Sequence, residues 1–297
     1  MKCLVTGGNG FIGSHIVDRL VSLGHQVVVI DDLSAPENEK FYYNSEAEYY
    51  EKDISKDNCS LIFQGVDNVF HLAARSRIQP TIGSPNQCFE TNVVGTQRVL
   101  EWSKLSGVKK VVYSGTSSLY GRANPAPFNP NMPADCLNPY SMSKWMGEQV
   151  CRLYTQLYSC DTVVLRYFNV YGPREPIKGC YAPVIGLFKR QLESGSPLTI
   201  VGDGNQRRDF TYVDDVVDAN ITAMQQSTFK RRVYNVGTGV NYTINDIAEM
   251  IAGKEAKTVR LPDRPAEVRE TLADIKETIE DLGWSPKTRL EDVIKAY

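Results

Sequence analysis

The sequence predicts an α/β fold, a doubly wound parallel sheet covered by helices, with a smaller C-terminal lobe. Three observations support this prediction. Short β-branched runs alternate with longer amphipathic segments, which is the pattern of β-α-β units. A glycine-rich turn joins the first strand to the first helix. After about residue 173 the strands become shorter, and Gly and Pro become frequent.

The alternation gives each element an expected place. We expect strands at Cys3–Thr6, Gln26–Ile30, Asn68–Leu72, Lys110–Tyr113 and Thr162–Phe168. We expect helices at Phe11–Leu23, Asn92–Ser106 and Tyr140–Tyr158, and two short closing helices at Ile275–Leu282 and Leu290–Ala296. Pro139 favours a helix that starts directly after Asn138. Residues 1–173 plus 209–238 would form the sheet domain, and residues 174–208 plus 239–297 the smaller lobe.

Bulk composition restricts the class of protein. The chain has 297 residues, 42% hydrophobic and 23% charged, with a net charge of −2, so we expect no nucleic-acid partner. No apolar run reaches the roughly 20 residues of a membrane span, and a strand pattern starts at once, without a signal peptide. Seven cysteines without paired spacing and only three histidines predict a cytoplasmic protein without a metal site.

The segment CLVTGGNGFIGSHIVDRL has the order strand, glycine turn, helix, with Gly7, Gly10 and Gly13 in the turn. Such a turn lets backbone N–H groups approach a pyrophosphate at the start of a helix. Asp31 ends the next strand, 18 residues after Gly13, near the spacing of a ribose-binding carboxylate. Because no Arg or Lys stands next to Asp31, we predict NAD rather than NADP. An ordinary turn with a solvated acid is the alternative.

A second motif, NPYSMSKW, puts Lys144 four residues after Tyr140, so both side chains share one helix face. A phenol with a pKa near 10 is a poor base at neutral pH. A neighbouring ammonium and a positive nicotinamide ring favour the phenolate, which would make Tyr140 a usable acid and base. Thr116 stands at the end of a predicted strand, where open parallel sheets bind ligands. We expect its hydroxyl at the same substrate oxygen.

Five ordered motifs, TGGNGFIGSH, HLAA, TNVVGT, the Thr-Tyr-Lys set and RYFNVYGPR, together resemble the extended short-chain dehydrogenase/reductase superfamily, nearly end to end. Within it the chain resembles the NAD-dependent epimerase/dehydratase family, and most of all the UDP-glucose and UDP-N-acetylglucosamine 4-epimerases. The resemblance implies a Rossmann-type fold, bound NAD and a nucleotide-sugar substrate. It also implies that Tyr140 is the catalytic base, Lys144 holds the nicotinamide ribose and Thr116 is the hydroxyl partner.

The resemblance further implies a set of cofactor contacts. Residues of the glycine turn cradle the pyrophosphate, two acids meet the adenosine ribose, the KDI segment meets adenine, and three later residues line the groove. In that order they are Gly7, Gly10, Phe11, Ile12 and Gly13; Asp31 and Asp32; Asp53 and Ile54; and Leu72, Ala73 and Asn92. Burial in the core is the alternative for Ile54 and Ala73, and a helix cap is the alternative for Asn92.

By the same resemblance, Asn169 contacts the substrate diphosphate, the guanidinium groups of Arg208 and Arg264 suit that diphosphate, and backbone around Thr199 and Val201 meets uracil. A solvated surface position is the alternative for the two arginines. The chain departs from the family at two loops. Ala266 and Glu267 stand where the family has Gly-Asp, and Lys178 stands where Asn is typical.

Ser117 and Ser118 distinguish among the reactions of the family. All members begin by oxidising C4 of the sugar, but the dehydratases carry an Asp-Glu pair directly after the catalytic Thr, and the decarboxylases a Glu at the second position. A serine hydroxyl cannot readily take the C5 proton that elimination requires. We therefore predict a UDP-sugar 4-epimerase. Thr271, at the position that controls access of N-acetyl sugars, is small and indicates that UDP-GlcNAc and UDP-GalNAc also fit.

The sequence leaves three alternative functions open, and the resemblance implies one protein partner. A uronate 4-epimerase would need a cation for the C6 carboxylate, for which Arg75, Arg77 or Arg174 is available. A reductase or dehydratase of the superfamily is the second alternative. A non-catalytic NAD-sensing regulator is the third, although such proteins lose the Tyr or Lys that this chain retains. The resemblance also implies a homodimer, paired through two helices whose outer apolar positions permit it: Val99, Trp102, Leu153 and Leu157. Burial within one chain explains these positions equally well.

Overall fold

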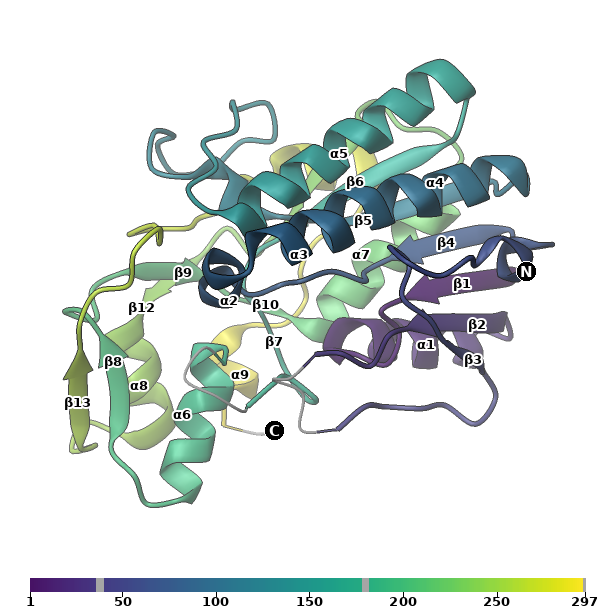
Figure 1. The fold of residues 1–297 in the computed structure, drawn as a ribbon. Helices are drawn as coiled ribbons and strands as arrows, with labels where there is room; N and C mark the ends of the chain where they lie inside the picture. Colours follow the sequence, from purple (N-terminus) through teal and green to yellow (C-terminus); the bar gives the residue numbers. More distant parts are fainter. Residues whose placement is uncertain (36–39, 178–181, 296–297) are drawn as a thin grey trace.

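A seven-stranded parallel sheet forms the centre of the computed structural model, which describes residues 1–35, 40–177 and 182–295 (Figure 1). Its strand order is β11-β6-β5-β4-β1-β2-β3. The strands are β1 (Lys2–Thr6), β2 (Gln26–Asp31), β3 (Glu48–Glu51), β4 (Asn68–His71), β5 (Lys110–Thr116), β6 (Thr162–Tyr167) and β11 (Val233–Val236). Because the order reverses between β1 and β4, a crevice for ligands is expected at the carboxyl ends of these two strands.

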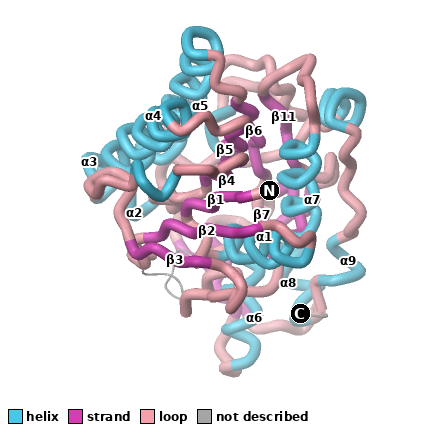
Figure 2. The backbone as a smooth tube through the Cα atoms, turned by 90° about the vertical axis from the view of Figure 1, so that its right-hand side faces the viewer, coloured by secondary structure: helices cyan, strands magenta, loops and turns pink. Residues whose placement is uncertain are grey.

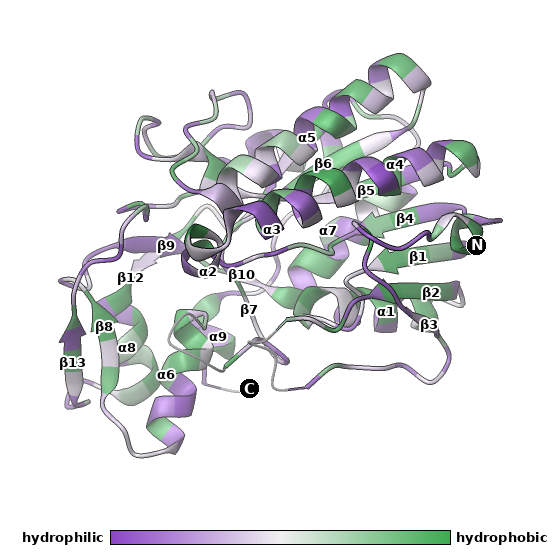
Figure 3. Cartoon of the chain, in the orientation of Figure 1, coloured by the Kyte–Doolittle hydropathy of each residue, from purple (hydrophilic) through white to green (hydrophobic). Residues whose placement is uncertain are grey.

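The predicted α/β fold is confirmed, and all five predicted strands are present within a few residues of their expected bounds. The sequence also contains a strand that we did not predict, β3. Its sequence, Glu-Tyr-Tyr-Glu, lacks a β-branched run, because β3 is an edge strand whose residues are exposed or half-buried. The inner strands are apolar, as the green strands of Figure 3 show, which is typical of a sheet buried on both faces.

Helices cover both faces of the sheet (Figure 2). α1 (Phe11–Ser22) and α7 (Val213–Gln225) pack together on one face, and α4 (Thr96–Leu105) and α5 (Pro139–Tyr158) on the other. The helix predicted at Asn92–Ser106 begins earlier than expected. α3 (Pro85–Phe89) continues through a π-type segment, Glu90–Gly95, directly into α4.

Two of the helix positions predicted to face a partner are wrong. Val99 and Trp102 are buried within the chain, where they pack in the core between α4 and the sheet. Leu153 and Leu157, by contrast, are 47% and 64% exposed on α5. The spacing of apolar residues could not separate the inner from the outer face of these helices, because both faces carry apolar side chains.

The C-terminal part adds small sheets and helices beside the crevice (Figure 1). The sheets pair β7 (Val170–Tyr171) with β10 (Thr211–Tyr212), β9 (Arg207–Asp209) with β12 (Asn241–Thr243), and β8 (Leu198–Val201) with β13 (Thr258–Leu261). The helices are α6 (Val184–Glu193), α8 (Ile244–Ala252) and α9 (Leu290–Val293). The predicted helix Ile275–Leu282 is present over residues 276–282, with a π-type segment at Thr278–Leu282, and the end of the other predicted helix, Ala296, lies outside the described residues. The two-lobe division stays a prediction.

Candidate active site

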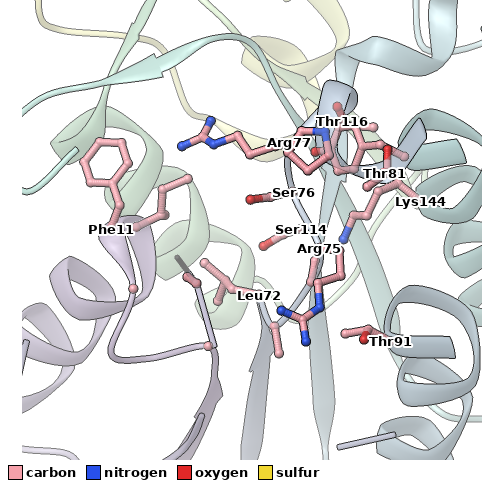
Figure 4. A pocket seen from close by; sticks show the side chains of 18 of the residues that line it. Phe11, Leu72, Arg75, Ser76, Arg77, Thr81, Thr91, Ser114, Thr116 and Lys144 are labelled. Carbon is pink, nitrogen blue, oxygen red and sulfur yellow. The ribbon is translucent and has the colours of Figure 1, made fainter. Parts of the chain in front are cut away.

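A cleft of about 560 Å³ lies at the carboxyl ends of β1, β4 and β5 (Figure 4). Most of the residues singled out from the sequence line it: Gly7, Gly10, Phe11, Ile12, Gly13, Asp31, Asp32, Asp53, Ile54, Leu72, Ala73, Thr116, Tyr140, Lys144, Asn169 and Arg264. Five predicted residues are not part of its lining: Asn92, Thr199, Val201, Arg208 and Thr271. The fold therefore brings together segments that are more than 250 residues apart in the chain.

The glycine turn fits tightly against its surroundings. Gly7 has a φ of +73°, and a side chain there would place its Cβ 2.7 Å from the backbone nitrogen of Ala73. A Cβ at Gly13 would lie 2.1 Å from the carbonyl oxygen of Gly7. Both distances are far below van der Waals contact, so the turn and the first turn of α1 can approach each other only because these two positions lack side chains.

The start of α1 is an anion site by its geometry. Gly10 caps the helix without a side-chain hydrogen bond, and the first turn contains no acidic residue. The N–H groups of Phe11 and Ile12 thus have no intrahelical acceptor, and the helix dipole adds positive potential. Together with the close-packed glycines, this end of the cleft fits a diphosphate.

Asp31 and Asp32 lie beside the glycine turn. The Asp31 carboxylate accepts hydrogen bonds from the backbone N–H groups of Asn9 and Leu33, both at 3.0 Å. Burial still raises the pKa of Asp31 above its usual value. The sequence has no Arg or Lys next to Asp31, but the fold brings Arg75 to Asp32, with 3.5 Å between Nη2 and Oδ2.

Asp53 and Ile54, which follow β3, also line the cleft. The Asp53 carboxylate accepts hydrogen bonds from the N–H and the hydroxyl of Ser55 and pairs with Lys56 at 3.0 Å, which together lower its pKa. Ile54 is buried in the core as well as exposed to the cleft on one edge. Asn92, predicted to line the groove, lies behind it, where its side-chain amide holds the backbone of Arg75.

α5 carries Tyr140 and Lys144 one turn apart. Asn138 accepts a hydrogen bond from the N–H of Ser141, whose hydroxyl accepts one in return from the N–H of Asn138, and Pro139 occupies the first helical position. This capping box fixes where the helix begins, as the sequence predicted. The start of α5 thereby places Tyr140 in the cleft.

Thr116 and Tyr140 meet in the cleft. The N–H of Ser118 donates to the Thr116 hydroxyl oxygen at 3.2 Å, which leaves the Thr116 proton free for another acceptor. Burial raises the pKa of Tyr140, while the Thr116 hydroxyl and the positive charge of Arg77 lower it. We expected Lys144 to lower this pKa, so the net direction differs from our expectation, because burial outweighs the favourable groups in the chain by itself.

Lys144 is fully enclosed. Burial lowers its pKa to about 8, and its ammonium lies 4.2 Å from the centre of the Tyr113 ring, whose face attracts a cation. One turn further along α5, Glu148 forms a buried ion pair with Arg166, with 2.9 Å between Oε2 and Nη2. The sequence analysis missed this pair. The four-residue spacing from Lys144 to Glu148 was its only signal.

Asn169 contacts one further predicted residue, Thr271. Its backbone has a φ of +25°, and its amide donates to the Asp209 carbonyl at 2.8 Å and to the Thr271 hydroxyl at 3.0 Å. Thr271 is thus buried behind Asn169. Thr271 supports Asn169 and is not part of the cleft lining, and its role in admitting N-acetyl sugars stays a prediction.

The two predicted arginines have different environments. Arg264 lines the cleft, 3.8 Å from the carboxylate of Glu267. Arg208 is half-buried beside the cleft, and its guanidinium donates to the carbonyl oxygens of Arg207, Val268 and Arg269. Ala266, which replaces a glycine of the family motif, takes a φ of +58° and so keeps the left-handed conformation that glycine would favour.

Thr199 and Val201 lie in β8, outside the cleft lining. The side-chain amide of Gln191 on α6 bonds both the hydroxyl and the N–H of Thr199, at 2.8 and 3.1 Å. Lys178, at the other departure from the family, lies outside the described residues. In the part of the chain that the structure describes, no group of three His, Cys, Asp or Glu side chains could hold a metal ion, and no helix could cross a membrane.

The chain is similar to known proteins over nearly its whole length. The chain is 38% identical to a putative UDP-glucose 4-epimerase of Methanocaldococcus jannaschii, over 98% of this chain and 95% of that one. A Thermotoga maritima UDP-glucose 4-epimerase solved with UDP-glucose is 35% identical, with a TM-score of 0.90, over 99% and 96% of the two chains. A Bacillus cereus UDP-glucuronic acid 4-epimerase solved with UDP-glucuronic acid and NAD is 33% identical, with a TM-score of 0.89, over the same shares.

The family model described as the NAD dependent epimerase/dehydratase family matches residues 3–237, which include both the glycine turn and the Tyr140 helix. The predicted cofactor is therefore confirmed as NAD, and the residues that line the cofactor end fit a dinucleotide. The chain belongs to the NAD dependent epimerase/dehydratase family and is an NAD-dependent nucleotide-sugar enzyme.

Proposed function

We propose that the protein is a UDP-sugar 4-epimerase that interconverts UDP-glucose and UDP-galactose. One observation carries the proposal. Thr116 and Tyr140 meet in the cleft, while the two residues after Thr116, which also line it, are Ser117 and Ser118. The site thus has a hydroxyl pair for proton transfer at one carbon, and serines where elimination from C5 and C6 would need carboxylates.

The residues of the chain divide the proton chemistry between them. Tyr140 takes the proton of the C4 hydroxyl, and the bound NAD supplies the hydride acceptor. Thr116 donates a hydrogen bond to the phenolate oxygen, because a phenolate can only accept, while the N–H of Ser118 donates to the Thr116 oxygen. The charge of Arg77 favours the same phenolate. When the sugar turns and the hydride returns to the other face of C4, Tyr140 gives the proton back.

We choose the substrate-binding residues from their positions in the cleft. Arg264 and Asn169 line the cleft, and the Arg264 guanidinium suits the diphosphate of the substrate. Both amide hydrogens of Asn169 are donated to Asp209 and Thr271, so Asn169 would meet the diphosphate through its backbone. Arg208, Thr199 and Val201 would serve the nucleotide only through backbone or through a shift of the loop that holds Arg264. We also propose a homodimer through the exposed part of α5 around Leu153 and Leu157, a subset of the positions first predicted.

A UDP-glucuronate 4-epimerase is the second candidate, and one observation favours it. Arg77 lines the cleft and acts on Tyr140 through its charge, so a cation lies near the reacting end of the site. The C6 carboxylate of a uronate would suit such a cation. Arg174, by comparison, pairs with Asp18 at 2.7 Å and is not part of the cleft lining.

The experiment that tests the proposal is incubation with UDP-glucose, UDP-GlcNAc and UDP-glucuronate in separate reactions, with the products read by NMR. Inversion at C4 of UDP-glucose supports the first candidate, and inversion of UDP-glucuronate alone supports the second. A 4-keto-6-deoxy product would overturn both.

Tyr140→Phe is the matched variant for this assay. It keeps the ring but removes the hydroxyl, so we expect turnover to fall by about 10³-fold or more while bound NAD is retained. Near-normal epimerisation by Tyr140→Phe would remove Tyr140 from the chemistry. Absorbance of NAD released by denaturing the purified variant provides the control for cofactor content.

A further inference from the structure

A side-chain bridge crosses the cofactor end of the cleft. The Arg75 Nη1 donates to the Ser34 hydroxyl at 2.8 Å, and its Nη2 lies 3.5 Å from the Asp32 carboxylate. All three residues line the cleft. Figure 4 shows Arg75 and Arg77 leaving the same wall with their guanidinium groups in different directions, Arg75 beside Leu72. The two arginines therefore serve different parts of the site.

The sheet order shows what the bridge spans. Asp32 directly follows β2, Arg75 follows β4, and β1 lies between these two strands. The glycine turn leaves the end of β1. A side chain that reaches from the end of β4 to the end of β2 must therefore pass across the end of β1, next to the glycine turn and the start of α1.

The side chain of Asn92 fixes the backbone of Arg75. Asn92 accepts a hydrogen bond from the Arg75 N–H at 2.8 Å and donates one to the Arg75 carbonyl at 3.1 Å. The two Nη atoms are directed to Asp32 and Ser34, but the Nε of Arg75 is buried and has no hydrogen-bond partner among the described residues. Because protein atoms enclose the Nε, it does not face the cleft, whereas Nη2 carries a second hydrogen that no described residue accepts.

We propose that Arg75 is a further cofactor-binding residue, whose guanidinium lies across the bound dinucleotide and donates from Nη2 to an oxygen of the cofactor diphosphate. The glycine turn and the start of α1 provide N–H groups but no cation, and a guanidinium supplies the missing positive charge. Asp32 and Ser34 hold the far edge of the guanidinium, and Asn92 is a positioning residue that sets its backbone. The inference holds for any sugar substrate.

If Arg75 holds the cofactor, the wild-type protein loses its bound NAD slowly, and variants at Arg75 lose it faster. We expect Arg75→Gln to weaken NAD binding by about 10- to 100-fold, the loss typical of one charge-assisted hydrogen bond. Arg75→Lys keeps the positive charge but replaces the planar guanidinium by a single ammonium, so we expect a smaller loss of NAD affinity, about 3- to 10-fold. The measurements are the dissociation constant of NAD from calorimetry, and the half-time with which purified protein loses bound NAD on dialysis. Neither needs a sugar substrate.

Arg232→Gln is the matched control. Arg232 also pairs with an aspartate, Asp161, but at the opposite edge of the sheet, where β6 and β11 begin. Melting temperatures of the NAD-free variants separate binding from folding. If Arg75→Gln binds NAD within threefold of wild type, as Arg232→Gln should, the proposal is overturned. It is also overturned if Arg75→Gln only lowers the melting temperature. Should Arg75→Gln not fold, Arg75→Lys, which keeps the charge, provides the comparison with Arg232→Gln.

Discussion

The two ends of the cleft are formed differently, one mainly by backbone and the other mainly by side chains. The cofactor end is made by consecutive backbone, in which residues 7–13 form the turn and the helix start, and a Cβ at Gly13 would overlap the Gly7 carbonyl. The sugar end is made by side chains from separate segments, among them Thr116, Tyr140, Asn169 and Arg264. The first end is determined by shape, and the second by charge and hydrogen bonding.

This difference determines which substitutions each end of the cleft tolerates. Backbone that is packed below van der Waals distance tolerates no added atom, since neither side can move without moving a strand or a helix. Side chains at the sugar end tolerate changes of size, but their pKa values and hydrogen bonds determine the chemistry. Substitutions can therefore separate cofactor binding from turnover.

The largest effect is expected at the cofactor end. Gly13→Ala places a Cβ 2.1 Å from the Gly7 oxygen and 2.8 Å from the Gly8 Cα, so α1 must shift away from the turn. We expect a loss of about 3 kcal/mol or more in the free energy of unfolding, and no NAD binding. Urea unfolding and NAD titration measure the two effects.

Gly83→Ala is the control for this prediction. No atom lies within 4 Å of a Cβ at Gly83, which ends the short helix α2 (Ile78–Gly83). Its stability should equal that of the wild type or exceed it slightly. If Gly13→Ala is as stable as Gly83→Ala and binds NAD, the turn is not the close-packed element that distinguishes this end.

An intermediate effect of opposite sign is expected at Lys144. Its pKa is about 8 in the fold and 10.5 in the unfolded chain, so at pH 7 the fold buries a charge at a cost. Between pH 8 and 10.5 the unfolded chain binds more protons, and stability therefore rises with pH in this window. We expect Lys144→Met to stabilise the NAD-free protein by roughly 2 kcal/mol at pH 7, while turnover is lost.

The pH dependence provides the control for Lys144→Met. The difference in the free energy of unfolding between variant and wild type should shrink as the pH rises from 7 to about 10, because the wild-type lysine is by then neutral in the fold and its protonation stabilises the unfolded chain less and less. Urea unfolding at several pH values measures this difference. A difference that stays constant with pH would mean that packing, and not the buried charge, explains the stability of the variant.

The smallest effect is expected behind Asn169. Thr271→Val removes the hydroxyl that accepts hydrogen bonds from the Asn169 amide and from the N–H of Asp209. The loss of about 1 kcal/mol of hydrogen bonding should raise KM for the UDP-sugar by about fivefold and leave kcat and NAD affinity unchanged. Steady-state kinetics measure both constants. Thr222→Val on α7, far from Asn169 in the chain, should change neither; an equal rise in KM there would argue against a specific role of Thr271.

The glycine turn of the cofactor end could be predicted from the sequence. Its residues are neighbours in the chain, and their types are dictated by backbone conformation and close approach, as at Gly7 and Gly13. The start of α5 was equally predictable, because Asn138 and Pro139 act locally on the helix that carries Tyr140.

The rest could not be predicted, because it depends on contacts between distant segments. No local pattern places Arg75 at Asp32, or Thr271 behind Asn169. The pKa of Tyr140 depends on burial, which outweighs the neighbouring groups that the sequence suggested. Val99 and Trp102 show the same limit, since periodicity identified apolar positions without saying which face of the helix the sheet would cover.

One labelling measurement tests the central claim most directly, which is that Tyr140 and Thr116 serve a reaction confined to C4. The protein is incubated with UDP-glucose that carries deuterium at C4, and the product is read by NMR. The account predicts UDP-galactose with the deuterium still at C4, because what leaves that carbon returns to it. Loss of the label to water, or a product changed at C5 or C6, would contradict the account.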